Sequence, residues 1–437
     1  MSLYGAMFSG VSGLNAQSQA LGMISDNISN VNTVGYKTAH AAFSTLVTQQ
    51  TGNSYAPGGV RSSPLYSIDR QGLLQSSGST TDLAISGQGF FVLAETAAPT
   101  ASDTRSYSRA GQFTADAEGY LRSPTGYYLQ GWRTDLAGTP VAANTSVLTS
   151  LESIRVNSVS GSASPTSSID LGLNLPASAT AGDTETTNVT VYDSLGVEHT
   201  ITLTWTKTAV ANTWTAVATT DDAGATIDEI AVGAGAGYSV DVLFNGDGTP
   251  QSFTPSSTGV AVTTPPALAV STWTSGATDS VMSMSMGTAG AIGTAVADGV
   301  TQFSSTYSVS FINQDGTQFG NFFGVKVDDN GIVTALFDNG ETQKIYKIPI
   351  ATFPNPNGLD AKTGTTYTQS ERSGDFFLRA AKEANAGTIV PSALEASTSD
   401  LAEEFTNMII TQRAYAASTR IITTADEMLD ELIRVKR

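Results

Sequence analysis

The fold is decided by the stretch SDNISNVNTVGYK, Ser25 to Lys37, because a helical pattern runs up to it and does not continue beyond it. Ahead of it, apolar residues recur every seven positions, at Met7, Leu14, Leu21 and Ile28. This spacing predicts a helix with a narrow, coiled-coil-like apolar stripe. Asparagine side chains compete for backbone hydrogen bonds, so Asn27, Asn30 and Asn32 predict the end of this helix. Gly35 is expected to take a left-handed conformation after it.

The C-terminal end of the chain carries a second stripe of the same kind. Its members, also spaced by seven positions, are Leu394, Leu401, Met408, Tyr415, Ile422 and Leu429, and Phe405 widens it. The two predicted helices either cap an ordinary globular core or pack on each other and on further copies of the chain. We favour the second interpretation, because isolated helices are marginal and the sequence between them predicts no helical layer.

The middle of the chain predicts β-structure, in short alternating runs that Gly and Asn/Asp turns separate. Residues 191–205 and 238–253 predict hairpins, and residues 316–353 predict a later set of strands. Lys207 is the only Lys or Arg between residues 156 and 300, although many acidic residues lie there. This shift in charge predicts a separately folded insertion.

The predicted fold class is therefore multi-domain, with terminal coiled-coil-like α-helices and mainly-β nested domains. The predicted segments are an N-terminal helix (1–34), an extended linker (35–80), a β-rich middle domain (81–155 with 301–364), an inserted outer β domain (156–300), a second linker (365–391) and a C-terminal helix (392–437).

Composition excludes several classes of function. The net charge of −18 disfavours binding to nucleic acid or to anionic membranes. The absence of Cys excludes disulfides, thiol catalysis and thiolate metal sites. The N-terminus has neither the basic region nor the long apolar region of a cleavable signal peptide. No apolar run approaches the ~18 residues that a membrane-spanning helix needs, so no membrane insertion is expected.

No residues are arranged for catalysis. The two histidines, His40 and His199, lie in the first linker and on a predicted strand, with no acid–nucleophile pattern nearby. The acidic turn at 328–331 lacks the spacing of a calcium loop and predicts a hairpin instead. We expect no catalytic, cofactor-binding or metal-binding residue, and we expect that the chain is not an enzyme.

The stretch Ser25 to Lys37 resembles the Asn-rich signature of the bacterial flagellar rod and hook family, carried here by Asn27, Asn30, Asn32, Thr33, Gly35 and Tyr36. Asp26 and Ser29 depart from the family's usual Asn and Ala. LAISGQGFFVL (Leu83 to Leu93) and YSRAGQF (Tyr107 to Phe113) resemble the family's next domain, as does GYLRSPTGYYLQGW (Gly119 to Trp132). The stretch from Ser392 to Leu429 resembles its C-terminal signature.

The resemblance implies a structural subunit that self-assembles, with its terminal helices as the inner layer of a tube and its β domains outside. Met7, Leu14, Leu21 and Ile28 would form the assembly seam of the first helix. Leu401, Phe405, Met408, Tyr415, Ile422 and Leu429 would form that of the second. The implied location is the extracellular flagellum, reached through the flagellar type III export apparatus.

The inserted domain favours the curved hook, the flexible joint that transmits torque from rod to filament, over a straight distal rod. Implied partners are further copies of the chain, the distal rod, and the hook cap and hook–filament junction proteins. An alternative of another class, a secreted β-rich adhesin, would not explain the paired terminal stripes.

Overall fold

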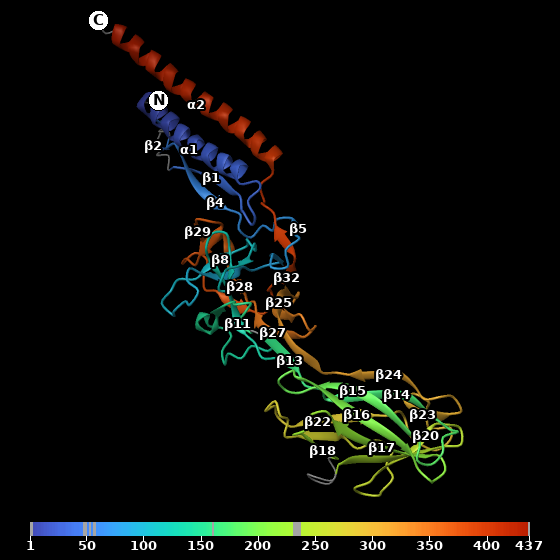
Figure 1. Cartoon of the computed structure of the whole chain (residues 1–437). Coiled ribbons are helices and arrows are strands. Elements are labelled where there is room, and N and C mark those ends of the chain that lie inside the picture. The colour runs from blue at the N-terminus through green and yellow to red at the C-terminus, as the bar shows by residue number, and fades with distance from the viewer. Residues whose placement is uncertain are drawn as a thin grey trace. The chain divides into compact units, whose positions relative to one another are not determined.

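In the computed structural model, which describes residues 3–46, 50–51, 54–55, 58–159, 161–229 and 237–435, a helix stands at each end of a chain made mostly of strands (Figure 1). The first helix, α1, is Leu3–Ser29, and the last, α2, is Leu401–Val435. The described residues between them add only two single-turn 3-10 helices, Leu148–Ser150 and Pro356–Gly358. The predicted fold class, a mostly β chain with a helix at each end, is confirmed.

The chain divides into two compact units. Unit 1 comprises Met1–Ser158, Gly324–Ala335 and Gln343–Arg437, and unit 2 comprises Val159–Phe323 and Leu336–Thr342. The chain passes from one unit to the other between Ser158 and Val159, within β25 (Thr317–Val327), within β26 (Ile332–Phe337) and at the start of β27 (Thr342–Lys347).

Strands of unit 1 come from both halves of the sequence. From the first half they are β1 (Ala39–Thr45), β2 (Gln50–Thr51), β3 (Ser54–Tyr55), β4 (Val60–Tyr66), β5 (Leu74–Ser76), β6 (Leu83–Ser86), β7 (Phe91–Ala94), β8 (Ser106–Ser108), β9 (Thr114–Ala115), β10 (Leu121–Arg122), β11 (Tyr128–Arg133) and β12 (Glu152–Ser153). From the second half they are β28 (Ile350–Thr352), β29 (Asp360–Lys362), β30 (Thr366–Thr368), β31 (Phe377–Arg379), β32 (Thr388–Pro391) and β33 (Ala393–Glu395).

Pairing of early with late strands holds unit 1 together. β32 pairs with β6, β33 with β5, and β30 with β8, all antiparallel. The core beneath them is aromatic: Tyr107 lies edge-on to Phe353 at 4.8 Å between ring centroids, and Phe90 contacts the same ring at 6.0 Å. The returning chain is therefore fixed to the outgoing chain just before it enters α2.

Unit 2 is built from two sheets around one apolar core. Its strands are β13 (Gly161–Ser164), β14 (Ser168–Pro176), β15 (Thr184–Tyr192), β16 (Glu198–Lys207), β17 (Thr213–Thr220), β18 (Thr226–Glu229), β19 (Tyr238–Phe244), β20 (Pro250–Pro255), β21 (Leu268–Ser271), β22 (Ser280–Ser285), β23 (Val300–Phe303) and β24 (Ser308–Gln314). One sheet has the order β15-β16-β17-β19-β20, and the other joins β18, β21, β22, β14, β23 and β24, while β13 belongs to neither and pairs with β25.

Alternation in β16 shows why these residues form a two-layered core. Ile201, Leu203 and Trp205 are buried, whereas the threonines between them are only half-buried, as the alternating sequence predicts for a strand with one apolar face. Trp214 and Trp273 belong to the same core. The predicted hairpins 191–205 and 238–253 are both present, as β15 with β16 and β19 with β20.

The predicted domain bounds stay a prediction, and some of them differ from the observed elements. Unit 2 extends past residue 300 to Phe323, because β24 pairs with β14. The segment predicted as a linker over 365–391 contains β30, β31 and β32. Within the first predicted linker, β1 and β4 pair antiparallel.

Candidate assembly site

The two terminal helices pack against each other in antiparallel directions. Contacts that pair the start of α1 with the later turns of α2 set this direction: a Cβ on Gly10 would lie 3.1 Å from Ile422 Cγ1, and one on Gly13 would lie 3.2 Å from Ser418 Oγ. Near the other end of α1, the Asn27 side chain reaches Glu404 in the first turn of α2. On α1, small and polar residues therefore make these contacts.

The structure divides the predicted seam residues into two groups. Those that are half-buried are Met7, Leu14, Leu21, Ile28, Met408, Ile422 and Leu429. Those that are exposed are Leu401, Phe405 and Tyr415. The buried positions of the helices include residues outside the predicted stripes, among them Ala16, Ala20 and Thr411.

Large apolar side chains lie exposed along both helices. On α1 these are Tyr4, Phe8 and Val11, with Phe8 59% exposed. On α2 they are Leu401, Phe405, Ile409, Ile410, Tyr415, Ile421, Met428 and Ile433. Ile409 and Ile410 are 52% and 60% exposed. Contiguous exposed apolar residues of this kind mark sites of protein–protein interaction.

Asn27 joins α1 to its neighbours through four hydrogen bonds, and it is fully buried. Its Nδ2 donates to the Ala39 carbonyl oxygen at 2.9 Å and to Glu404 Oε1 at 2.8 Å. Its Oδ1 accepts from the Ala39 N–H at 3.1 Å and from the Tyr36 hydroxyl at 3.0 Å. Every polar atom of this side chain has a partner, so Asn27 fixes α1 to the start of β1 and to α2.

The prediction for the Asn-rich stretch was correct about the helix end and wrong about how Asn27 acts. α1 ends at Ser29, and Asn30 Nδ2 donates back to the Asp26 carbonyl oxygen at 2.9 Å. Asn27, by contrast, lies inside the helix and bonds to distant residues. Gly35 is left-handed as expected, with φ +69°, but it lies in the turns after the helix and not directly at its last turn.

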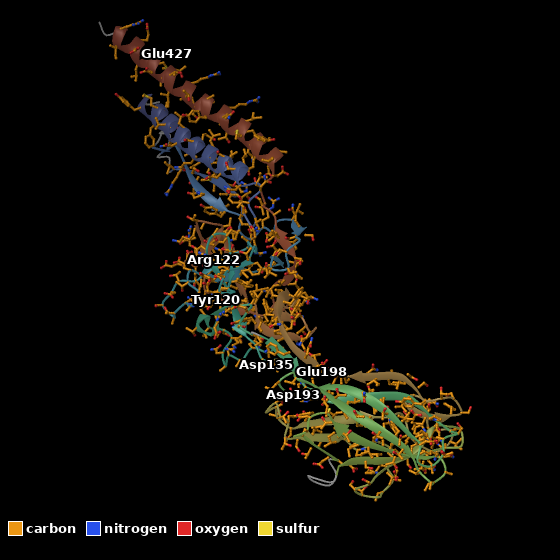
Figure 2. All side chains as sticks on the ribbon, viewed as in Figure 1. Tyr120, Arg122, Asp135, Asp193, Glu198 and Glu427 are labelled. Atoms are coloured by element: carbon orange, nitrogen blue, oxygen red, sulfur yellow. The ribbon has the colours of Figure 1, made fainter. Side chains whose placement is uncertain are left out.

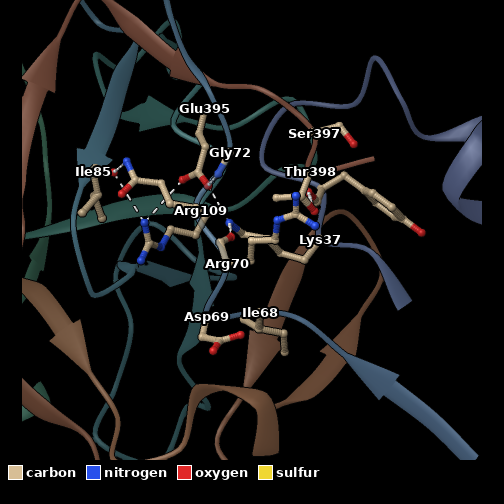
Figure 3. Close-up of polar contacts among 12 residues, drawn as sticks. Lys37, Ile68, Asp69, Arg70, Gly72, Ile85, Arg109, Glu395, Ser397 and Thr398 are labelled. Carbon is tan, nitrogen blue, oxygen red and sulfur yellow. Dashed lines mark hydrogen bonds and ion pairs between the residues drawn. The ribbon is translucent and has the colours of Figure 1, made fainter. Parts of the chain in front are cut away.

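A second buried polar centre surrounds Glu395, at the end of β33 (Figure 3). Its Oε1 contacts Lys37 Nζ at 2.5 Å and accepts from the Gly72 N–H at 2.8 Å. Its Oε2 lies 3.4 Å from Arg109 Nη1. The side chains of Glu395, Lys37 and Arg109 are 0%, 1% and 3% exposed. One carboxylate thus joins the segment after α1, the segment before β5 and the middle strands.

Both cations of this centre have further partners, as buried charges require. Lys37 Nζ also donates to the Arg70 carbonyl oxygen, and Arg109 Nη2 donates to the Gly87 carbonyl oxygen at 2.8 Å. Burial lowers the pKa of Lys37 and that of Arg109, and the carboxylate of Glu395 opposes both shifts. Glu395 therefore stabilises the charged forms of two buried cations.

Close backbone contacts surround this centre. A Cβ on Gly72 would lie 2.1 Å from the Ala396 carbonyl oxygen, and one on Gly35 would lie 2.6 Å from the Ala110 backbone nitrogen. The Gly35 N–H donates to the Glu395 carbonyl oxygen at 2.8 Å. Glycine is required at Gly35 by its positive φ and at both positions by the lack of space.

The sequence did not single out Lys37, Arg109, Glu395 or Glu404. Lys37 ends the quoted Asn-rich stretch and Arg109 lies within the quoted YSRAGQF, but neither was assigned a partner. One feature of the sequence could have indicated Glu395, because it is the only charged residue between Val390 and Ser399. Which residues pair with it depends on strand pairing between distant parts of the chain.

Unit 2 holds one polar cluster that sequence reasoning missed, around His199. Its Nε2 lies 3.2 Å from Asp193 Oδ2, and its Nδ1 lies 3.9 Å from Asp222 Oδ2. The ring stacks on Trp273 at 4.1 Å between centroids. Asp193 follows β15, and Glu198 begins β16 (Figure 2). The Ser275 hydroxyl donates to Asp193 and not to the imidazole, so the cluster lacks the geometry of a nucleophile and its base.

Among the described residues, no group of three or more His, Asp or Glu side chains is placed to hold a metal ion. No helix within the described ranges is both long and apolar enough to cross a membrane.

Comparison with known families gives four matches along the chain. Residues 7–37 match the family described as flagella basal body rod protein, and residues 390–435 match the flagellar basal body rod FlgEFG protein C-terminal family. Residues 84–191 match the flagellar hook protein FlgE/F/G D1 domain, and residues 160–317 match the flagellar basal body protein FlaE D2 domain. These matches define a class, the rod and hook proteins of the flagellum.

Relatives narrow the class further. The chain is 34% identical to the flagellar hook protein FlgE of Caulobacter vibrioides, over 100% of both chains. It is 33% identical to the flagellar hook proteins FlgE of Rhizobium meliloti and Brucella suis, again over 100% of each chain. The chain therefore belongs to the flagellar hook protein family, as the resemblance of its motifs predicted.

Proposed function

We propose that this chain is the repeating subunit of a flagellar hook, a curved tube that transmits torque from rod to filament. The observation that carries the proposal is the row of exposed apolar side chains along α1 and α2. In a polymer, neighbouring copies would cover these side chains, and the two helices would form the inner layer. The predicted seam residues would then act in two ways, with the half-buried ones supporting the helices and Leu401, Phe405 and Tyr415 contacting a neighbour.

A distal rod subunit is the second candidate, since two of the matched families are named for the rod. The domain matched at residues 160–317 and the full-length hook relatives favour the hook. We infer that the partners are further copies of the chain, the distal rod, and the hook cap and junction proteins. We also infer export by the flagellar type III apparatus without a cleavable signal, an extracellular location, and no enzymatic activity.

Polymerisation of purified protein tests the proposal. Phe405→Ser with Ile409→Ser removes two side chains that are 51% and 52% exposed and that a neighbour would bury. Burying half of each is worth about 2 kcal/mol in total, so the concentration needed for polymerisation should rise about 30-fold. Thermal unfolding should change little, because about half of each side chain is exposed to solvent in the single chain.

Val281→Ser is the matched control, because Val281 is 57% exposed but lies on β22 of unit 2. It should polymerise at the concentration of the unmodified chain. If the helix variant also polymerised at that concentration, the helices would not be the assembly surface.

A further inference from the structure

A pocket lies where α1, β1 and α2 meet, with a volume of about 330 Å³. Its walls are apolar in part, and the apolar residues include Ile24, Phe43 and Ile410. His40, Asn407 and Glu404 add polar groups. Pockets that combine apolar walls with a few polar groups accept a side chain or ligand of matching chemistry.

Glu404 is the group in this pocket that lacks a complete set of partners. The residue is 2% exposed. Its Oε1 accepts from Asn27 Nδ2, but its Oε2 has no hydrogen-bond partner among the described residues. Burial raises the pKa of Glu404, because the carboxylate is withdrawn from water, and the hydrogen bond from Asn27 and the nearby His40 oppose that shift only in part. A buried carboxylate of this kind is costly unless a positive group joins it.

Positive groups suited to this carboxylate lie elsewhere on the same helix. α1 contains no Lys or Arg, and the described part of α2 contains Arg413, Arg420 and Arg434. Arg434 lies 3.9 Å from Glu431, whereas Arg413 and Arg420 are exposed and form no ion pair within the described residues. The first turn of α2 is acidic, with Glu403 and Glu404. One stretch of α2 thus complements another in charge.

A single chain cannot bring these groups together along one straight helix. Arg413 and Arg420 lie 9 and 16 residues beyond Glu404 in α2. At a rise of 1.5 Å per residue they are about 13 and 24 Å away along the axis. A second copy whose α2 is displaced by such a distance could place either guanidinium at the pocket.

We propose that the α1–β1–α2 pocket binds an arginine side chain, Arg413 or Arg420, from a neighbouring copy of this chain. The inference rests on the proposed function and adds to it a specific polar contact, which would fix the stagger between neighbouring helices. The aliphatic stem of the arginine would pack on the apolar walls while its guanidinium donates to Glu404. An apolar side chain in the same pocket is the rival occupant.

Polymerisation of charge-neutral variants distinguishes the two occupants. Glu404→Gln keeps an oxygen to accept from Asn27 but replaces Oε2 with an NH₂ group, which repels a guanidinium. The concentration needed for polymerisation should rise about 10-fold or more, as for the loss of one charged hydrogen bond. Arg413→Gln or Arg420→Gln should reproduce that rise. A double variant that combines Glu404→Gln with the effective arginine change should need little more protein to polymerise than either single variant, because the two changes remove the same contact.

Two controls make the same charge changes outside the pocket. Glu403→Gln alters the exposed neighbour of Glu404, and Arg434→Gln alters the arginine that already lies near Glu431. Both should polymerise like the unmodified chain. The two arginine variants alter exposed side chains, so their effect on assembly does not depend on whether Glu404→Gln folds.

The proposal is overturned if Glu404→Gln polymerises as well as or better than the unmodified chain, the result that an apolar occupant predicts. It is also overturned if neither arginine variant affects assembly. Failure of the unmodified chain to polymerise would overturn the proposed function itself, and the pocket proposal with it. A polymerising unmodified chain with an equally competent Glu404→Gln would overturn the pocket proposal alone.

Discussion

Replacing Asn27 with Ala should loosen both terminal helices while leaving unit 2 intact. The change removes four hydrogen bonds and leaves the Ala39 N–H, the Ala39 carbonyl oxygen and Glu404 Oε1 without that partner. Each buried group left unsatisfied costs about 1–3 kcal/mol. Allowing for water entering the space, we expect a loss of about 3–5 kcal/mol in the local stability of the helix pair.

Hydrogen exchange followed by mass spectrometry measures this loss region by region. Peptides from residues 3–29 and 401–435 should exchange at least about 100-fold faster in Asn27→Ala, since each 1.4 kcal/mol corresponds to a factor of ten. Peptides from residues 198–244 in unit 2 should not change. Asn32→Ala is the control, because Asn32 is exposed and its replacement should leave exchange almost unchanged.

An increase of less than about threefold in the helix peptides of Asn27→Ala would refute this reasoning. It would mean that packing alone holds α1 to α2, and that the hydrogen bonds of Asn27 add nothing net. Equal effects of Asn27→Ala and Asn32→Ala would lead to the same conclusion.

Three further outcomes are expected. Gly35→Val places a branched side chain at a residue with φ +69°, and its Cβ would lie 2.6 Å from the Ala110 nitrogen. Electron microscopy of this variant should therefore find few or no tubes. Normal tubes would show that assembly does not depend on this turn. Glu395→Gln leaves two buried cations without a carboxylate partner, and it should lower the free energy of unfolding of unit 1, measured by calorimetry, by about 3–5 kcal/mol. Asp360→Asn, in the exposed pair with Arg372, should lower it by less than about 1 kcal/mol. Similar losses in the two variants would contradict a special role for the buried centre. Hydrogen bonds from Thr274 and Gly224 lower the pKa of Asp222, so its contribution to the stability of unit 2 is present above the unfolded carboxyl pKa of about 3.9 and is lost as pH falls through the lower folded value. Fluorescence of Trp205, Trp214 and Trp273 during acid unfolding should then show a weaker pH dependence in Asp222→Asn, and an unchanged profile would contradict this assignment.

Periodic patterns were enough to predict the elements of this fold. The seven-residue stripes predicted both helices, and strict alternation in 201–205 predicted the buried face of β16. Local turn chemistry predicted the left-handed Gly35 and the hairpins of unit 2. Each of these features depends on residues that are close together in the sequence, so a single sequence is enough to predict it.

The polar centres could not be predicted in the same way. Glu395 meets Lys37 and Arg109 across separations of 358 and 286 residues, and Asn27 meets Glu404 across 377. Such pairs follow from how early and late strands align, which no local pattern encodes. The stripes also predicted more apolar residues at the contact between the helices than the structure places there. Gly10 and Gly13 lie at that contact, whereas Phe405 is exposed. In the proposed polymer, part of the apolar pattern would serve contacts that a single chain does not contain.

A three-dimensional image of the polymer formed by the purified chain, obtained by electron cryo-microscopy, tests the central claim most directly. The account predicts a curved tube in which residues 3–29 and 401–435 form the innermost layer, with Phe405, Ile409 and Ile410 buried against neighbouring copies. A straight rod would favour the rod alternative. A polymer in which these helices lie on the outside, or in which those three side chains stay exposed to solvent, would contradict the account.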